Sequence, residues 1–182
     1  MIEPDRLTVA ELLRQHAYRT ACIGKWHLGW QWATLDGAPA HQNSEIGKLD
    51  VKQRRAMEQN IDYTKPMRGG PIDCGFDTYF GVDVPNFPPA TWFEQDRLTD
   101  PPTADKPEEM FGFPGCMKPD WKLEEMIPTF INRATAYIEE SDADPFFLYL
   151  PLTSPHTPIV PNEAFIGRSD AGRYGDFVCE VD

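Results

Sequence analysis

The sequence predicts an α/β fold, and two buried strands, each preceded by a helical segment, are the main reason. The first apolar run covers residues 20–23 and follows a short amphipathic segment. The second covers residues 146–150 and follows a longer segment with helical periodicity. A helix followed by a strand is the repeat unit of a sheet covered by helices. We therefore expect a mostly parallel or mixed sheet flanked by helices, interrupted by a long irregular region.

The first predicted unit begins with a capping signal. Thr8 and Glu11 form a T-x-x-E capping box, in which the Thr side chain satisfies a free backbone N–H at the start of the helix. The apolar residues Val9, Leu12 and Leu13 are expected on one face of this helix. The strand over 20–23 comes next.

Residues 30–124 are expected to be an irregular insertion rich in aromatic residues and proline. A polar segment over 44–60 predicts a solvated helix, and the Pro-rich stretch over 99–115 is incompatible with regular structure. The many aromatic residues argue against disorder and favour a folded binding surface. Within it we expect Asn86, Trp92 and Phe93 to contact substrate, although packing of the loop itself explains Trp92 and Phe93 equally well.

The third part returns to regular structure. Apolar residues recur at helical spacing over 123–140, which predicts an amphipathic helix packed on a sheet; they are Met126, Ile127, Phe130, Ile131, Ala134 and Ile138. The following run over 146–150 has the pattern of a strand buried on both faces. It ends in "TSPHTPIVP", so this strand, like the first, is followed by a histidine.

Composition and charge narrow the function classes. The chain has 182 residues, a net charge of -12 and an isoelectric point of about 4.7, so a nucleic-acid partner is not expected. No window is apolar over the length that a membrane span needs. The four cysteines lack C-x-x-C spacing, which argues against a zinc knuckle and leaves three disulfide pairings open.

Lys25, His27 and His156 are the candidate catalytic residues. Ligands of open α/β sheets bind at the carboxyl ends of parallel strands, and all three residues follow a predicted strand. If the segment stays extended, Lys25 and His27 face the same side. A lysine and two histidines with no nearby carboxylate favour an anion and suit hydrolysis of an ester whose leaving oxygen develops charge. A lone histidine is more often merely solvated, and we accept that interpretation for His16 and His41.

Four segments then resemble one family in the same order along the chain. They are "YRTACIGKWHLG", "CGFDTYFG", "PFFLYLPLTSPHTP" and "SDAGRYGDFVCEVD". Together they resemble the type I sulfatases, also called arylsulfatases, which depend on formylglycine and belong to the alkaline-phosphatase-like superfamily. The resemblance implies a partial sulfatase fold and a sulfuric ester hydrolase.

The resemblance also implies roles for the three candidates. Lys25 would contact the sulfate and the modified nucleophile, and His27 would hold the hydrated aldehyde and assist sulfate release. His156 would contact the sulfate near its bridging oxygen and protonate the leaving alcohol. The implied cofactors are Ca²⁺ and formylglycine, and the implied partner is a small-molecule or glycan sulfate ester.

Other parts of the family pattern are missing from the sequence. The nucleophile motif C/S-x-P/A-x-R is not found before Lys25, and Ser169 to Arg173, which fits it literally, lies after the second signature and is rejected. We expect no metal ligands in this chain, because no cluster supplies the six or more oxygens that Ca²⁺ takes. Residues 1–182 are thus expected to be the central part of one sulfatase catalytic domain. We expect the N-terminal nucleophile segment and the C-terminal metal half-site to be absent.

Three functions follow from these observations. In the first, the parent protein is a sulfatase and this chain alone is inactive. In the second, the chain is a non-catalytic, sulfatase-like remnant that binds anionic glycans or a partner. A phosphodiesterase or phosphatase of the same superfamily is the further alternative. The resemblance implies a periplasmic or secreted parent protein. The identity of the ester and the oligomeric state stay open.

Overall fold

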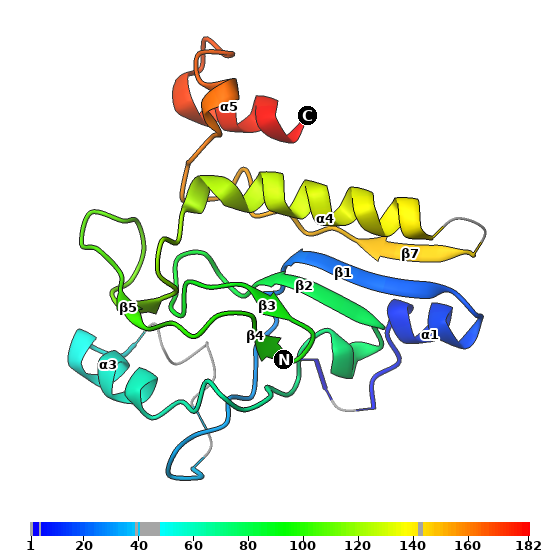
Figure 1. The fold of residues 1–182 in the computed structure, drawn as a ribbon, viewed down its shortest axis with the longest axis horizontal. Coiled ribbons are helices and arrows are strands. Elements are labelled where there is room, and N and C mark those ends of the chain that lie inside the picture. The colour runs from blue at the N-terminus through cyan, green and yellow to red at the C-terminus, as the bar shows by residue number, and fades with distance from the viewer. Residues whose placement is uncertain (1, 4, 39, 41–47, 142–143) are drawn as a thin grey trace.

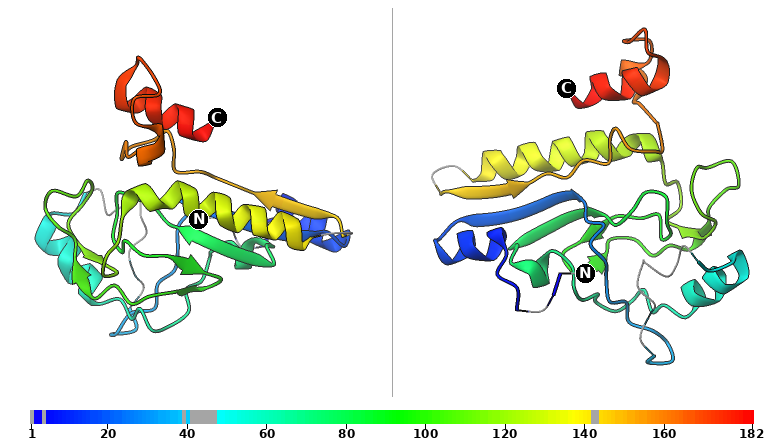
Figure 2. Two further views of the ribbon diagram at one scale, coloured as in Figure 1. Left: turned by 45° about the horizontal axis from the view of Figure 1, so that its top comes forward. Right: turned by 180° about the vertical axis from the view of Figure 1, so that it is seen from behind.

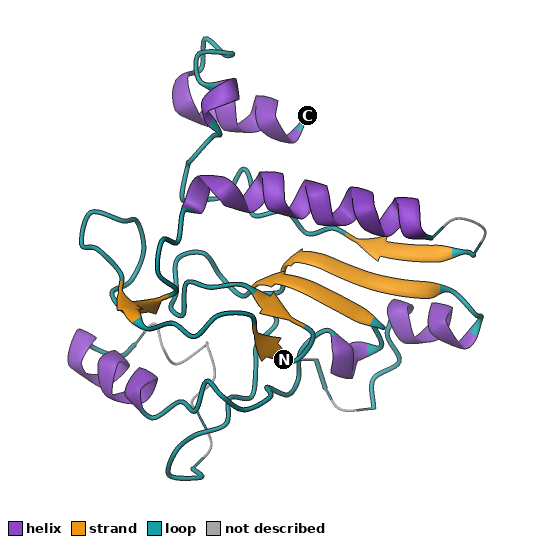
Figure 3. Cartoon of the chain, in the orientation of Figure 1, coloured by secondary structure: helices purple, strands orange, loops and turns teal. Residues whose placement is uncertain are grey.

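A five-stranded mixed sheet forms the centre of the computed structural model, which describes residues 2–3, 5–38, 40, 48–141 and 144–182 (Figures 1 and 3). The strand order is β4-β3-β2-β1-β7. β1 pairs in parallel with β2 and with β7, whereas β3 and β4 are antiparallel additions at the other edge. The strands are β1 (Arg19–Lys25), β2 (Thr78–Val82), β3 (Phe93–Glu94), β4 (Arg97–Leu98) and β7 (Phe146–Tyr149).

Helices and short turns surround this sheet. The α-helices are α1 (Val9–Gln15), α3 (Val51–Gln59), α4 (Met126–Glu140) and α5 (Gly172–Val181). The short 3-10 helices are η1 (Ile72–Cys74), η2 (Leu123–Glu125) and η3 (Glu163–Phe165). A second, two-stranded sheet is formed by β5 (Ala104–Asp105) and β6 (Cys116–Met117). α5 lies beyond α4, on the side away from β2, in all three views of Figures 1 and 2.

The sheet has a hydrophobic cluster on each face, because successive strand residues point to opposite sides. On β1, Ala21 and Ile23 pack in the cluster that contains the buried side of α4, including Phe130. Cys22, between them, packs in the cluster that contains Ala10 of α1. The alternation along β1 therefore fixes which helix covers which face.

Two sequence predictions about helices are confirmed and one is wrong. The Thr8 hydroxyl accepts a hydrogen bond from the Glu11 backbone N–H at 3.0 Å and caps α1. The amphipathic helix over 123–140 is present as η2 and α4, although Ile131 and Ile138 of its expected apolar face are 43% and 48% exposed. The apolar face expected for α1 is not its buried face, since Val9 and Leu12 are 57% and 41% exposed. α1 instead contacts the core through Ala10, whose small side chain allows a close approach.

The expectation of irregular structure over 30–124 is wrong at the short strands β2 to β6, of which β5 lies within the Pro-rich stretch over 99–115. β2 lies in the middle of the sheet, and β3 and β4 extend the sheet from it. The five residues of β2 lie between turn residues, so their strand character arises mainly from pairing with β1. α3 confirms the predicted polar helix over 51–59, whereas residues 44–47 of that prediction lie outside the described residues.

The predicted strand over 146–150 is present as β7, but its predicted burial is wrong. β7 occupies one edge of the sheet, with Phe146 and Tyr149 38% and 43% exposed. An edge strand has a pairing partner on one side only.

Among the described residues, no helix combines the length and the apolar character needed to cross a membrane.

Candidate active site

The parallel strands bring three chain segments together at the carboxyl end of β1. Lys25 is the last residue of β1, and its backbone N–H donates to the Pro151 carbonyl, just after β7, at 2.8 Å. The next N–H, that of Trp26, donates to the Val82 carbonyl at the end of β2 at 2.9 Å. The end of β1 is therefore held between the ends of both neighbouring strands, as the strand-end prediction required.

Two glycines allow these strand ends to approach so closely. Gly24 has φ +135°, and a Cβ there would lie 2.3 Å from the Pro151 carbonyl oxygen. A Cβ on Gly81 of β2 would lie 1.8 Å from the Gly24 carbonyl oxygen. Both distances are shorter than any real Cβ contact, so the backbone next to Lys25 requires glycine at both positions.

His27 leaves the extended path that the sequence predicted for it. Its φ is +51°, in the left-handed region that residues other than glycine rarely adopt. Trp26 anchors this turn, since its ring is 4% exposed and its Nε1–H donates to the Gly29 carbonyl at 3.2 Å. The proximity of His27 to Lys25 thus depends on a turn around a buried tryptophan and not on strand alternation.

Lys25, His27 and His156 form one electrostatic cluster. The His27 side chain is exposed, but its partial desolvation lowers its pKa, and the positive charges of Lys25 and His156 lower it further. Because Coulomb interactions weaken with distance, both charges must lie near the His27 ring. The structure therefore brings together the three candidates that the sequence placed after strands.

The hydrogen bond of His156 indicates which ring nitrogen is available for chemistry. The side chain is exposed, and its Nδ1 lies 2.7 Å from the Thr157 carbonyl oxygen. A carbonyl oxygen only accepts, so we assign the proton of this contact to Nδ1. Nε2 is then the nitrogen that can exchange a proton with a ligand.

Asp83 is the site residue that the sequence interpretation missed. Burial lowers the pKa of Lys25, and the negative charge of Asp83 acts in the opposite direction. The expectation of a cationic trio without a nearby carboxylate is therefore wrong. Asp83 directly follows β2, as His27 closely follows β1, so recognising residues 78–82 as a parallel neighbour would have predicted it.

The three residues expected to contact substrate lie in different surroundings. Phe93 is fully buried and stacks on Trp30 with ring centroids 5.4 Å apart, which speaks against contact with a substrate. Trp92 is half-buried and packs on Trp121, with centroids 4.7 Å apart. Asn86 has a buried Oδ1 that makes no hydrogen bond within the described part of the chain. Their role toward substrate stays a prediction.

The described residues do not form a site that fits Ca²⁺. In the ranges that the structure describes, no group of three or more His, Cys, Asp or Glu side chains is placed to hold a metal ion. Ca²⁺ takes about six to eight oxygen ligands. Asp83 on its own falls far short of such a set, so we derive no step through a metal.

Comparison with known proteins identifies the family. The Sulfatase family model matches residues 2–182. The chain belongs to the sulfatase family. Structural comparison finds the same fold in solved sulfatases. One of them, from a study of glycosaminoglycan metabolism by Bacteroides thetaiotaomicron, superposes with a TM-score of 0.72 at 22% identity. The match covers 99% of this chain and 40% of that one. A sulfatase from Pseudoalteromonas sp. gives a TM-score of 0.55 at 15% identity, covering 97% of this chain and 32% of that one.

Curated relatives are sulfatases as well. An N-acetylgalactosamine-6-O-sulfatase of Bacteroides thetaiotaomicron is 25% identical over 205 residues, which cover 100% of this chain and 38% of the relative. Human Arylsulfatase H is 39% identical over 206 residues, which cover 98% of this chain and 36% of the relative. This sulfatase chain therefore spans less than two-fifths of the length of either relative.

Proposed function

We propose that the whole protein containing these residues hydrolyses a sulfate ester. The observation that carries the proposal is the cluster of Lys25, His27 and His156 at the carboxyl end of β1, in a chain of the sulfatase family. A sulfate group carries negative charge on its outer oxygens, and the bridging oxygen gains charge as its bond to sulfur breaks. A fixed cation and two imidazoles match both requirements.

Each residue has a separate task in this proposal. The Lys25 ammonium binds the outer sulfate oxygens, and Asp83 holds that ammonium in place. His156 gives a proton from Nε2 to the bridging oxygen as the sulfur–oxygen bond breaks, so that the alcohol leaves neutral. His27, whose lowered pKa keeps it largely neutral near pH 7, can accept the proton that is given up as sulfate is released from the nucleophile.

The cofactors belong to the proposal for the whole protein. The family resemblance implies a formylglycine, which supplies the nucleophile for sulfur when present, and a Ca²⁺ ion. What supports them is membership of the sulfatase family. The described residues supply neither group. The side chains of this chain bind the sulfate and move protons, whereas the new bond to sulfur would be formed by the formylglycine.

We further propose a sulfated sugar as the substrate and an exported protein as the parent. The relative named N-acetylgalactosamine-6-O-sulfatase matches along the whole chain and supports the sugar class. The periplasmic or secreted location follows from the family resemblance alone. Fractionation of the source cells, with detection of the protein by antibody, tests the location directly.

The activity is tested with the protein expressed from its complete coding sequence. Sulfate released from N-acetylgalactosamine 6-sulfate is measured for the wild type and for Lys25→Ala. We expect the substitution to lower kcat/KM about 100-fold or more, the usual effect of removing a group that stabilises developing charge. His16→Ala, at the end of α1, serves as the control and should keep full activity. A Lys25→Ala protein as active as the wild type would contradict the proposal.

A further inference from the structure

Tyr79 carries a buried hydroxyl group to which the proposed function assigns no task. The residue belongs to β2 and is 2% exposed. Its hydroxyl donates to the Val82 carbonyl at 3.1 Å and makes a second, longer contact of 3.5 Å with the Gly24 carbonyl. One side chain therefore joins the carboxyl ends of β2 and β1 inside the protein.

The two carbonyls that accept from Tyr79 belong to the peptide groups of two site residues. The Gly24 carbonyl shares its peptide group with the Lys25 N–H, and the Val82 carbonyl shares its peptide group with the Asp83 N–H. Because a peptide group is planar, a bond to its carbonyl also restrains the Cα atom that follows. The Tyr79 hydroxyl thus restrains the backbone that carries both the ammonium and the carboxylate.

The Tyr79 ring is held in the orientation that these contacts need. Gly81 lies two residues further along β2 and on the same face, and a Cβ there would lie 3.0 Å from Tyr79 Cε2. Glycine at this position therefore gives the ring room to lie along the strand. The ring also packs on Trp30, with centroids 5.7 Å apart, and the Tyr79 backbone N–H donates to Gln95 Oε1 at 2.8 Å.

The Tyr79 hydroxyl keeps its proton at neutral pH. Burial raises its pKa well above the ordinary value, and the neighbouring acidic groups of Cys22 and Asp83 raise it further. Because Coulomb interactions weaken with distance, Asp83 must lie near this hydroxyl. Tyr79 is therefore a permanent hydrogen-bond donor next to the carboxylate that acts on Lys25.

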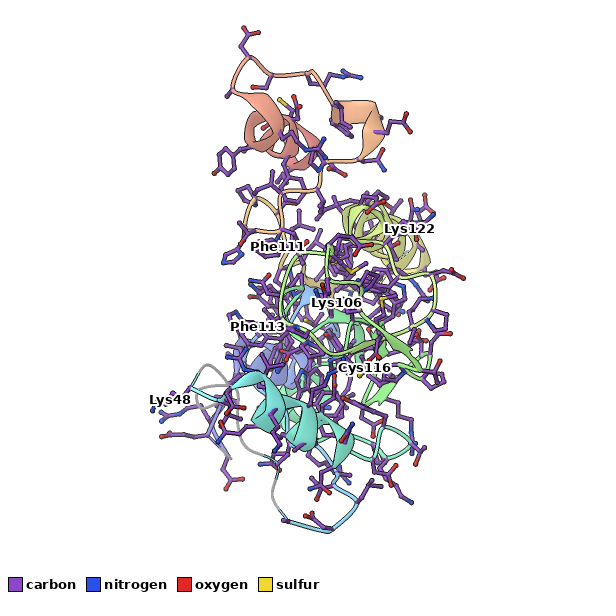
Figure 4. All side chains as sticks on the ribbon, turned by 90° about the vertical axis from the view of Figure 1, so that its left-hand side faces the viewer. Lys48, Lys106, Phe111, Phe113, Cys116 and Lys122 are labelled. Carbon is purple, nitrogen blue, oxygen red and sulfur yellow. The ribbon has the colours of Figure 1, made fainter. Side chains whose placement is uncertain are left out.

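The place of this bond in the sheet makes it useful for the site. The ladder between β1 and β2 ends with the pair Lys25 and Val82. These strand ends face the viewer in Figure 4, on the side of the molecule that also carries Lys106 and Phe113. Ends of regular structure open more readily than their middles, so an added bond from Tyr79 keeps the last pair closed.

We propose that Tyr79 is a positioning residue of the sulfate site, whose hydroxyl holds Lys25 and Asp83 at the spacing in which the ammonium binds sulfate beside His27. The inference rests on the proposed function, because it takes Lys25 to bind the sulfate. Tyr79 acts only through the backbone and touches no substrate. Tyr79→Phe removes the hydroxyl and keeps the ring against Trp30, so it separates positioning from packing.

Tyr137→Phe is the matched control for this substitution. Tyr137 is also a buried tyrosine, but its ring packs on Arg19 and Phe146, where β1 and β7 begin. The control therefore removes the same group at the opposite end of the strands. Both variants are made in the protein expressed from its complete coding sequence. Calorimetry measures the dissociation constant of inorganic sulfate, and NMR measures the titration midpoint of His27 in the absence of sulfate.

We expect Tyr79→Phe to change both measurements. Sulfate binding should weaken about fivefold, the usual scale for the loss of one buried hydrogen bond. The His27 midpoint should rise, because the Lys25 charge is held less firmly beside the ring. Tyr137→Phe should leave both values as they are in the wild type.

Each other outcome has a definite meaning. An unchanged His27 midpoint in Tyr79→Phe overturns the positioning role and leaves the proposed function standing. Equal changes in Tyr79→Phe and Tyr137→Phe overturn it too, because a general loss of stability then explains both. If Lys25→Ala binds sulfate as tightly as the wild type, the proposed function fails. The His27 midpoint in Tyr79→Phe then still tests whether Tyr79 positions Lys25, because that measurement contains no sulfate.

Discussion

At the scale of single residues, the ionisation of His27 is the most informative property of the site. Partial desolvation and the charges of Lys25 and His156 disfavour its protonated form. We predict that the His27 ring titrates with a midpoint below its ordinary value of 6.5. Lys25→Ala should raise that midpoint, because it removes one repelling charge. NMR titration of the histidine ring signals measures both, and a midpoint at or above 6.5 in the wild type would contradict the account.

The same shift links His27 to folding stability. Because its pKa is lower in the folded chain, the unfolded chain binds more protons between the two values. The contribution of His27 to the free energy of unfolding is fully present above its pKa in the unfolded chain, about 6.5. It is lost as the pH falls from there to the pKa of His27 in the folded chain. We predict that the free energy of unfolding, measured in urea, falls less steeply over this window in His27→Gln. An identical slope in the wild type and the variant would show that His27 is not perturbed.

At the scale of elements, the site depends on how closely β1, β2 and the segment after β7 approach. Gly24 has a positive φ and lies against the Pro151 carbonyl, and Gly81 lies against the Gly24 carbonyl. We predict that alanine at either position lowers the free energy of unfolding by about 3 kcal/mol or more, because backbone atoms have to move. Urea unfolding followed by circular dichroism measures this loss.

Gly37→Ala is the matched control for these substitutions. Gly37 has φ +73°, but a Cβ there would meet nothing within 4 Å. Its cost is therefore confined to backbone strain, about 1 kcal/mol. Equal losses at Gly24 and Gly37 would mean that the close strand contact contributes nothing.

How much of each element was predictable depends on how local its signal is. The T-x-x-E capping signal at Thr8, the apolar run in β1 and the helical spacing in α4 are contiguous patterns, and they predicted elements that the structure contains. β2 has five residues between turn residues, and its place beside β1 is a tertiary property. Because residues 78–82 were not recognised as a strand, Asp83 directly after them was not predicted as a site residue. Lys25, His27 and His156 follow strands that were recognised.

At the scale of the whole molecule, the free edge of the sheet has a consequence for association. In the part of the chain that the structure describes, β7 pairs with β1 on one side only and exposes Phe146 and Tyr149. Unpaired edges with apolar side chains promote pairing between molecules. We predict that the 182-residue chain self-associates and that Tyr149→Lys reduces this association. Sedimentation velocity over a concentration series measures it.

The control for this prediction is a lysine placed on a helix surface. Ile131→Lys adds the same charge at a residue that is 43% exposed on α4. If both variants lower association equally, net charge is responsible and not the edge of β7.

The most direct test of the central claim is an NMR titration of the histidine ring signals with sodium sulfate. We predict that the His27 and His156 signals shift with one shared dissociation constant and that Lys25→Ala abolishes both shifts. His16 precedes β1, whose seven residues span about 20 Å, so its signal should stay unchanged. Shifts of equal size at His16 and His27, or shifts that persist in Lys25→Ala, would contradict a sulfate site at this end of the sheet.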